Sequence, residues 1–229
     1  RLWLEVWYYR LKPFECAAGF YLLGFLALTL FHRKKLGIGL ILGALLFHTL
    51  GIALRVYILQ RPPVSNMYES MIFMNWALMI YASVFSILRK NSLAIATGSI
   101  LSALVMIYAN LLPIDSSLEV LVPVLRSNYW LTIHVMTIVS SYGAFGLAMA
   151  LGHRHLFLRA VGKLDQNSEA ESAALIFRVI QWGALLIGTG TFLGGVWANE
   201  SWGRFWGWDP KETWALITFL GYLIIVHLK

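Results

Sequence analysis

The chain has 229 residues, of which 59% are hydrophobic and 13% are charged. So few charged residues cannot cover the surface of a water-soluble globule, which excludes an ordinary soluble domain and predicts a protein that lies in lipid. The net charge is +7, but the basic residues form short clusters at the ends of apolar runs and no stripe along one helix. This arrangement predicts membrane topology and argues against a nucleic-acid partner.

The first predicted element is residues 1–16, which are rich in aromatic and charged side chains and suit an interfacial helix that lies on the membrane without spanning it. About seven apolar stretches follow, each long enough to cross a hydrocarbon core of about 30 Å. They are predicted at residues 17–31, 37–58, 67–88, 92–109, 129–152, 173–196 and 211–228. We therefore expect an all-α polytopic membrane helical bundle, with residues 17–229 as one transmembrane domain and no second, soluble domain.

The basic clusters predict the orientation of these helices. Alternation of the spans puts three clusters on one side, at residues 32–35, 89–90 and 154–163. The positive-inside rule assigns that side to the cytoplasm. The outer loops are then residues 59–66, 110–128 and 197–210.

Two helix starts carry the pattern of a capping box, Asn66 with Glu69 and Ser168 with Glu171. Two glycine pairs are spaced for close helix packing in lipid, or are incidental in a glycine-rich chain, Gly39/Gly43 and Gly190/Gly194. The single cysteine, Cys16, excludes an intrachain disulfide framework and a Cys-x-x-Cys pair. Since the chain begins at Arg1 without a methionine and stops at Lys229 after an apolar run, we expect a piece of a longer protein, incomplete at its C-terminus.

The densest signal is the segment from Val196 to Trp214, which holds half of the 10 tryptophans. Asp209, Pro210 and Glu212 match a helix N-terminus, with an aspartate cap, a proline in the first position and a glutamate that closes a capping box. Two glycines, at 203 and 207, allow tight turns before this point. We therefore predict a rigid apolar shelf made by Trp202, Trp206 and Trp208.

An aromatic belt is the alternative for these tryptophans, because tryptophan is enriched at membrane interfaces of many proteins. A belt spreads its tryptophans over many helix ends, whereas this chain concentrates them in one loop. The pattern therefore favours a binding surface. For Asp209 and Glu212 themselves, the pattern predicts capping and no acid or base chemistry.

At these residues the sequence resembles a known family. The stretch from Trp202 to Ala215 looks like the tryptophan-rich "WWD" signature of haem-handling proteins, in the form found in the CcsA (ResC) family of system II cytochrome c biogenesis. Residues 63–70 (PVSNMYES) and 130–135 (WLTIHV) also resemble that family. The resemblance extends from about residue 36 to the end of the chain, and the opening segment is similar to the start of the CcsA portion in fused CcsBA synthetases.

The resemblance implies a function in cytochrome c biogenesis. It implies that the protein transports haem b to the outer face of the membrane and presents it on the tryptophan-rich loop for thioether attachment to the Cys-x-x-Cys-His motif of apocytochrome c. The implied partners are apocytochrome c and a CcsB/ResB-type subunit or fused domain, together forming a holocytochrome c synthase (haem lyase). The implied location is the cytoplasmic membrane of a bacterium, or the thylakoid membrane of a plastid.

The resemblance also implies which residues contact haem. His134 matches an outer axial ligand, and His227 matches a histidine of a haem site within the membrane. His48 is a weaker candidate, for which a hydrogen-bonded core histidine is as good an interpretation. The platform residues are Trp202, Trp206, Trp208, Asp209 and Trp214, with Arg126, Arg204 and Lys211 as propionate partners or ordinary interfacial anchors.

Depth separates these histidines. Counted from a cap at Ser127 or Asn128, His134 lies roughly 10 Å below the outer end of its helix, at about 1.5 Å per residue. By the same rise His227 lies roughly 27 Å below the shelf and His48 roughly 18 Å deep, so His227 and His134 cannot share an iron. We expect the remaining histidines to be solvated loop residues, namely His32, His153 and His155.

Two other functions stay open at this point. The first is a haem exporter or relay that hands haem to a chaperone, as in the related CcmC proteins, which share the tryptophan signature. The second is a membrane scaffold or channel without haem, whose tryptophans form a belt and whose histidines are packing residues. The Pro-Lys-Glu-Thr-Trp continuation after Asp209 is closer to CcsA and favours the ligase. The family's second outer histidine follows a further transmembrane helix, which this chain lacks.

Overall fold

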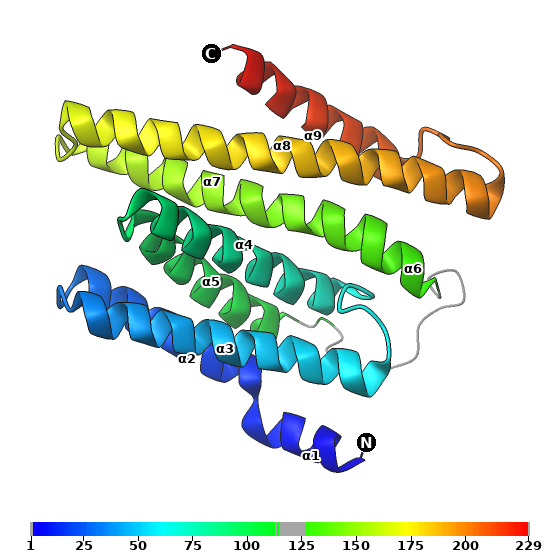
Figure 1. Cartoon of the computed structure of the whole chain (residues 1–229), viewed down its shortest axis with the longest axis horizontal. Coiled ribbons are helices and arrows are strands. Elements are labelled where there is room, and N and C mark those ends of the chain that lie inside the picture. The colour runs from blue at the N-terminus through cyan, green and yellow to red at the C-terminus, as the bar shows by residue number, and fades with distance from the viewer. Residues whose placement is uncertain (1, 113, 115–126, 229) are drawn as a thin grey trace. The chain divides into compact units, whose positions relative to one another are not determined.

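The computed structural model describes residues 2–112, 114 and 127–228, and all regular elements in these ranges are helices. The chain forms two compact units, Arg1–Val122 (unit 1) and Pro123–Lys229 (unit 2). Figure 1 shows the helices of each unit in their chain order. The predicted all-α class is therefore confirmed. The predicted boundary between an interfacial segment, residues 1–16, and a transmembrane domain, residues 17–229, stays a prediction.

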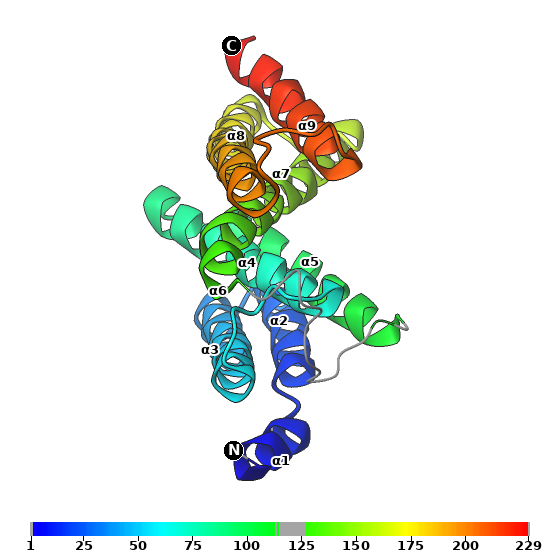
Figure 2. The same cartoon turned by 90° about the vertical axis from the view of Figure 1, so that its right-hand side faces the viewer.

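Unit 1 consists of helices that pack side by side. α2 lies along both α3 and α5, and α4 lies along α5 (Figures 1 and 2). Lys12, in the left-handed backbone region, separates the first two helices, and Pro13 begins the second one. The helices are α1 (Leu2–Leu11), α2 (Pro13–Thr29), α3 (Lys34–Leu59), α4 (Met67–Arg89) and α5 (Leu93–Leu111).

Glycines bring α2 and α3 into close contact. A Cβ atom on Gly24 would lie 2.5 Å from a side-chain carbon of Ile41, and one on Gly37 would lie 2.5 Å from Leu28. Such small residues let helix backbones approach in lipid. The pair named from sequence, Gly39 and Gly43, has open space around both positions, so its spacing is incidental to packing among the described residues.

A buried ionic cluster joins α1, α3 and α4. The side chain of Glu69 is 0% exposed and lies 2.9 Å from Nη2 of Arg55, which is itself 2% exposed. Arg55 also donates from Nη1 to the hydroxyl of Tyr8 at 3.1 Å, and Arg61 approaches the same carboxylate at 3.5 Å. Because breaking a buried pair leaves an uncompensated charge, this cluster holds the three helices in one arrangement.

The cap predicted at the start of α4 is confirmed in part. Asn66 accepts a hydrogen bond from the backbone N–H of Glu69 at 2.7 Å, as a cap should. The carboxylate of Glu69, however, accepts from the backbone N–H of Ser65 at 3.0 Å and binds Arg55. Its role is thus mainly ionic.

Unit 2 is a long antiparallel helix pair with a third helix on one member. α7 and α8 pack along their lengths, and α9 packs on α8 (Figures 1 and 2). A short π-helical segment, labelled η2, precedes α7 and continues into it without an intervening loop. The elements are α6 (Asn128–Trp130), η2 (Leu131–Val135), α7 (Met136–Ala160), α8 (Gln166–Trp202) and α9 (Pro210–His227).

α8 is much longer than the span predicted at 173–196. It begins at Gln166 after an Asp165 cap, so Ser168 lies inside its first turn and the start predicted at Ser168 is wrong. It ends at Trp202, where Gly203 adopts the left-handed conformation at φ 69°. The loop predicted at residues 197–210 is therefore shortened to residues 203–209, and Trp197 and Trp202 are helical residues.

Six stretches of the described chain are long and apolar enough to cross a membrane, which confirms a multi-pass membrane protein. The first stretch, Trp3–Thr29, includes most of the segment that was predicted to lie at the interface. α9, predicted as the last span, is not among the six, although it has 18 residues and none of its described side chains is buried. The other five are Lys34–Leu59, Met67–Arg89, Leu93–Leu111, Asn128–Ala160 and Gln166–Trp202.

Candidate functional site

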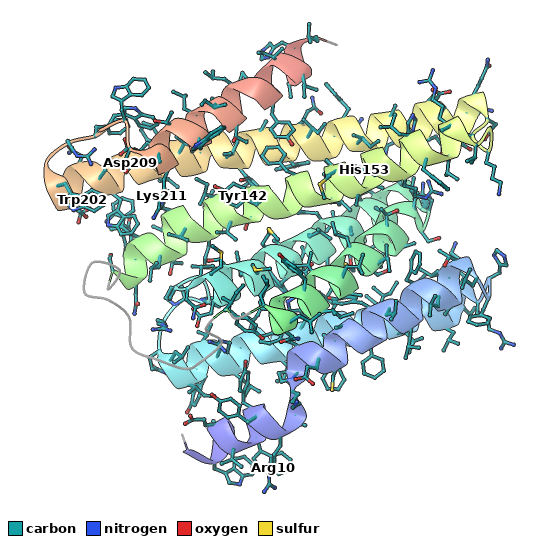
Figure 3. All side chains as sticks on the ribbon, turned by 180° about the vertical axis from the view of Figure 1, so that it is seen from behind. Arg10, Tyr142, His153, Trp202, Asp209 and Lys211 are labelled. Carbon is teal, nitrogen blue, oxygen red and sulfur yellow. The ribbon has the colours of Figure 1, made fainter. Side chains whose placement is uncertain are left out.

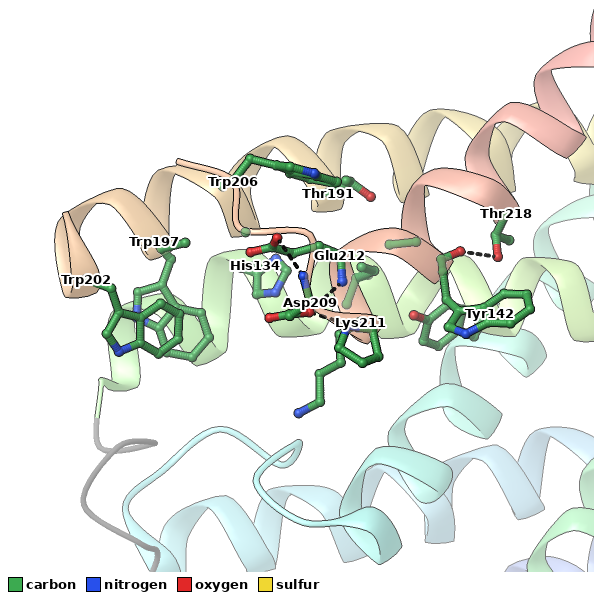
Figure 4. A pocket seen from close by; sticks show the side chains of 17 residues that line it. His134, Tyr142, Thr191, Trp197, Trp202, Trp206, Asp209, Lys211, Glu212 and Thr218 are labelled. Carbon is green, nitrogen blue, oxygen red and sulfur yellow. Dashed lines mark hydrogen bonds between the residues drawn. The ribbon is translucent and has the colours of Figure 1, made fainter. Parts of the chain in front are cut away.

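Unit 2 contains a cavity of about 730 Å³, which we call the tryptophan pocket (Figure 4). Its volume falls in the range of about 300–1,000 Å³ that is usual for small-molecule and cofactor sites. Three segments form its walls: one face of η2 and α7, the C-terminal part of α8, and the loop with the first three turns of α9. The tryptophans that line it are Trp197, Trp202, Trp206 and Trp214.

His134 is the histidine of this pocket. Its Nδ1 lies 2.8 Å from the backbone carbonyl oxygen of Gly190 on α8. Because a carbonyl can only accept, Nδ1 carries the proton and Nε2 keeps its lone pair. A backbone carbonyl behind the ring is the usual arrangement for a metal-binding imidazole, since it fixes the tautomer and the ring plane. The contact with Gly190 therefore leaves Nε2 as the ring nitrogen with a lone pair.

A π-helical turn and two glycines place this ring. His134 lies in η2, and single π turns occur frequently at functional sites. Below the turn, Ile138 and Tyr142 continue the same lining face of α7. On α8, a Cβ atom at Gly190 would lie 3.0 Å from Cβ of Ile138, and one at Gly194 would lie 2.6 Å from Cε1 of His134. Of the two glycine pairs named from sequence, Gly190/Gly194 is the pair that lies at a close contact between helices.

A stack of aromatic rings, Trp130, Trp197 and Trp202, stands at the outer end of the pocket. The rings of Trp130 and Trp197 are 6.4 Å apart at 13°, and those of Trp197 and Trp202 are 6.4 Å apart at 28°. The ring of His134 is 5.7 Å from that of Trp197. Trp130 donates its indole N–H to Glu200 at 3.0 Å, which ties the short helix α6 to α8. This aromatic stack is a rigid wall beside the candidate ligand.

The start of α9 forms the opposite wall, and its predicted cap is confirmed. The carboxylate of Asp209 accepts from the backbone N–H groups of Lys211 at 2.8 Å and Glu212 at 2.9 Å. Glu212 returns the bond to the N–H of Asp209 at 3.4 Å and also binds that of Gly207 at 2.7 Å. Both carboxylates are thus engaged in fixing the loop, as expected from the capping interpretation.

The loop turns differently from the prediction at one position. The residue with positive φ after Gly203 is Trp208, at φ 57°, and not Gly207. Gly207 instead leaves space for the guanidinium of Arg204, which lies against its Cα and reaches Glu212 at 3.5 Å. Trp208 is 69% exposed and does not line the pocket, so the lining shelf consists of Trp202 and Trp206 without it.

The pocket brings together only part of the residues named from sequence. Figure 3 shows Trp202, Asp209 and Lys211 near one end of unit 2, Tyr142 further along α7 and His153 nearer the other end of that helix. Arg204 pairs with Glu212 and does not line the pocket. Arg126 lies outside the described residues. The candidates that do line it are His134, Trp202, Trp206, Asp209, Lys211 and Trp214.

The two candidates for an inner site differ in their surroundings. His48, in unit 1, is 0% exposed, and both ring nitrogens have partners: Nδ1 lies 3.3 Å from the hydroxyl of Tyr21, and Nε2 lies 3.1 Å from the carbonyl of Ile72. His227, near the end of α9, is exposed, and its Nδ1 lies 2.8 Å from the carbonyl of Leu223. His48 thus matches the hydrogen-bonded alternative, whereas His227 keeps one nitrogen available.

The other histidines are not all in loops. His32 lies exposed in the turn before α3, as expected, but His153 and His155 lie inside α7. His153 is exposed, while His155 is half-buried with Nδ1 2.9 Å from the hydroxyl of Ser172 on α8. The loop placement of these two residues was wrong because α7 continues beyond the predicted end at residue 152.

Among the polar and aromatic lining residues, four were not predicted from the sequence, namely Tyr142, Thr191, Trp197 and Thr218. Tyr142 follows His134 by two helical steps of four residues, and this spacing was a usable signal. Trp197 was hidden because residues 197–202 were assigned to a loop. The two threonines donate to backbone carbonyls of their own helices and left no pattern in the sequence.

Comparisons with known proteins agree with the site. A family profile described as "Cytochrome C assembly protein" matches residues 64–229. "Protein NrfI" of Wolinella succinogenes is 39% identical over 252 aligned positions, which cover 100% of this chain and 27% of the relative. "Cytochrome c biogenesis protein CcsA" of Cyanidium caldarium is 33% identical, in an alignment that covers 73% of this chain and 68% of the relative. The protein of the same name from Prochlorococcus marinus strain NATL2A is 33% identical, in an alignment that covers 80% of this chain and 69% of the relative.

The chain therefore spans only 27% of NrfI but about two thirds of the CcsA relatives, at 68% and 69%. The family profile covers most of the chain, including both walls of the tryptophan pocket. These matches, together with six apolar helices, show a membrane protein of cytochrome c biogenesis. The chain belongs to the CcsA family of cytochrome c assembly proteins.

Proposed function

We propose that the tryptophan pocket binds haem at the outer face of the membrane, with His134 as an axial ligand, and presents it to apocytochrome c for thioether attachment. The observation that carries this proposal is the imidazole of His134. Its Nδ1 is held by the carbonyl of Gly190, while the ring lines a cavity of about 730 Å³. This arrangement leaves Nε2 for iron.

The walls of the pocket suit a large, flat and mostly apolar ligand. Four tryptophans line it, and tryptophan faces bury large apolar area at fixed geometry. His134 stands next to Trp197, so a ring system bound at Nε2 would lie close to the aromatic stack. Apolar walls with a few placed polar groups are typical of cofactor sites.

Lys211 is the best candidate for a propionate partner. It lines the pocket, it is exposed, and it forms no ion pair among the described residues. Arg204 is already 3.5 Å from Glu212, so its charge is partly compensated. A lysine ammonium forms a charge-assisted hydrogen bond with a carboxylate. We therefore assign the propionate contact to Lys211 ahead of Arg204, while Arg126 lies outside the described residues.

The contribution of this chain to thioether formation is position and orientation. Each thiol of the Cys-x-x-Cys-His motif adds across one vinyl group: a carbon–sulfur bond forms at the carbon next to the ring, the π bond breaks, and the terminal carbon takes the hydrogen. No external oxidant or reductant is required. Asp209 and Glu212 are engaged in capping, so neither carboxylate is assigned acid or base chemistry. Holding the reacting groups together is itself a large rate effect.

The proposal includes an earlier, intramembrane site at His227, from which haem passes to the outer pocket. The carbonyl of Leu223 holds Nδ1 of His227, which again leaves Nε2 for iron. For His48 to take part, its bond to Tyr21 or to Ile72 must open first. His227 therefore carries the inner-site proposal, and His48 would join only after that rearrangement.

The partners and the location are proposed from the family. The tryptophan pocket offers a single lining histidine, so a second axial ligand has to come from outside its lining. We propose a CcsB-type subunit or fused domain as the partner, and the cytoplasmic membrane of a bacterium, or a thylakoid membrane, as the location. The two alternative locations are supported by the organisms of the relatives, because CcsA proteins of a bacterium and of an alga match the chain. The CcsB-type partner is proposed from the family resemblance alone.

The absorption spectrum of the purified full-length protein tests this proposal. We expect a haem Soret band that is lost or strongly reduced in His134→Gly and restored, at a shifted wavelength, by added imidazole. His153→Ala is the matched control, since His153 is an exposed histidine on the same helix, outside the pocket. A colourless protein from haem-replete cells, or an unchanged spectrum in His134→Gly, would falsify the proposal.

A second experiment separates ligation from relay. Purified protein and partner are mixed with an apocytochrome c that carries Cys-x-x-Cys-His, and covalent haem is measured on a denaturing gel. Covalent attachment that depends on His134 supports the ligase. Transfer of haem without a covalent product would instead indicate an exporter or relay.

A further inference from the structure

A second cavity, of about 280 Å³, lies in unit 1 between α3, α4 and the start of α5. We call it the lysine groove, because Lys34 at the start of α3 and Lys90 at the end of α4 both line it. The groove belongs entirely to unit 1, so it is separate from the tryptophan pocket. Nothing in the proposed haem chemistry uses it.

The floor of the groove is apolar and runs along the helices. Lys34, Ile38 and Leu42 follow each other at every fourth position, so they form one stripe on α3. At about 1.5 Å per residue this stripe is roughly 12 Å long. On α4 the lining includes Ile87 before Lys90, and Ile95 of α5 closes the back. The apolar stripe of α3 therefore faces a wall that also carries small polar side chains, and both lysines belong to the lining; the polar residues are Ser83, Ser86, Asn91 and Ser92.

The charge of the two lysines is uncompensated. Neither Lys34 nor Lys90 forms an ion pair among the described residues, and no lining residue is acidic. The same end of unit 1 carries further basic residues, Arg33, Lys35 and Arg89. Basic pockets between transmembrane helices bind anionic lipid head groups. A phosphate at the two ammonium groups with an acyl chain along the stripe matches both features.

We infer that the lysine groove is a binding site for an anionic phospholipid, whose phosphate contacts Lys34 and Lys90 and whose acyl chain packs on Ile38 and Leu42. The two lysines select negative charge, and the apolar stripe selects a lipid over a small soluble anion. The site stabilises the end of the α3–α4 pair from the basic side of the membrane.

Native mass spectrometry of the full-length protein tests this inference. The protein is released from detergent with phosphatidylglycerol or with phosphatidylcholine, and bound lipid is counted. We expect the parent protein to retain phosphatidylglycerol. The amount of bound phosphatidylglycerol should fall about fivefold in Lys34→Ser and about fivefold in Lys90→Ser. The charge-matched control is the double variant Lys35→Ser with Lys163→Ser, because both lysines are exposed and neither lines the groove.

Equal loss in that control, or equal retention of phosphatidylcholine, overturns the inference, because either result shows non-selective adsorption. Leu42→Trp tests the apolar stripe, since Leu42 is 50% exposed and the larger ring fills the groove. It should reduce binding of long-chain phosphatidylglycerol without affecting the haem spectrum. Displacement of the lipid by millimolar inorganic phosphate alone would show that the groove is only an anion site, and would also overturn the inference.

Discussion

The imidazole of His134 lies so close to the backbone of Gly194 that a methyl group on this glycine would come within 2.6 Å of its Cε1 atom. One helical turn earlier on α8, the carbonyl of Gly190 accepts the hydrogen bond from the same ring. α8 therefore both orients the candidate ligand and gives it space.

Gly194→Ala should displace the ring of His134 and lower haem occupancy of the outer pocket by tenfold or more, while the protein stays folded. Alanine is the better helix former by about 0.5–1 kcal/mol, which offsets part of the roughly 1–3 kcal/mol that such a clash costs, so the melting temperature separates lost stability from displacement of the ring. Haem per protein and the melting temperature are the two measurements. Gly152→Ala on α7 is the control, because no heavy atom lies within 4 Å of its added carbon. Equal haem loading in both variants would contradict the placement of His134.

Trp130→Phe should weaken the aromatic stack. Trp130 is 6% exposed, and its indole N–H is bonded to Glu200. Because Glu200 is exposed and water can replace the lost donor, removing this hydrogen bond costs about 0.5–1.5 kcal/mol. Chemical unfolding and the near-ultraviolet circular dichroism of the stacked rings measure the change. Trp182→Phe, on the exposed surface of α8, should change neither by a comparable amount.

Asp209→Ala should loosen the wall formed by α9. The side chain caps two backbone N–H groups, and loss of such a cap costs about 0.5–2 kcal/mol. We expect faster hydrogen exchange at Lys211, Glu212 and Thr213 and weaker haem binding. Asp209→Asn retains an acceptor and should behave almost as the parent does. If the asparagine variant lost haem as fully as the alanine variant, a charge effect of Asp209 would replace the capping explanation.

Glu69→Gln should destabilise unit 1 strongly. It removes the charge that compensates Arg55 in a site where the two side chains are 0% and 2% exposed. Breaking a buried pair in this way costs about 3–5 kcal/mol. Glu15→Gln is the matched control, because the Lys12–Glu15 pair is 61% and 53% exposed and such pairs contribute about 0–1 kcal/mol. Similar melting temperatures for both variants would show that the buried pair contributes little.

Most helices were predicted within a few residues, because apolar runs of membrane length and capping patterns are local signals. Asn66 and Asp209 mark the starts of α4 and α9 as expected. The exceptions are α7, which ends at Ala160 instead of residue 152, and α8, which extends beyond the predicted span 173–196 at both ends. At the C-terminal end of α8, the polar residues Asn199, Glu200 and Ser201 resembled a loop. In this extension, Trp130 donates a hydrogen bond to Glu200 across 70 positions in the sequence, a contact that no local pattern reports.

The site was predicted in its residue types and not in its geometry. His134 and the tryptophans were found through the signature, but the π turn and the Gly190 carbonyl that orient the ring are visible only in the structure. Likewise, the partners of His48 are Tyr21 and Ile72, which lie 27 and 24 positions away. Residue spacing gave the depth of each histidine and could not tell which of its nitrogens were already bonded.

The length of α8 has a consequence for the geometry of the tryptophan pocket. With 37 residues and a rise of about 1.5 Å per residue, the helix is about 55 Å long, well beyond a hydrocarbon core of about 30 Å. Part of this helix therefore extends beyond the hydrocarbon core, and the number of residues between Gly190 and Trp197 sets how far Trp197 and Trp202 stand from His134 along α8. One residue inserted between Gly190 and Trp197 would raise the tryptophans by about 1.5 Å and rotate them by about 100° away from His134.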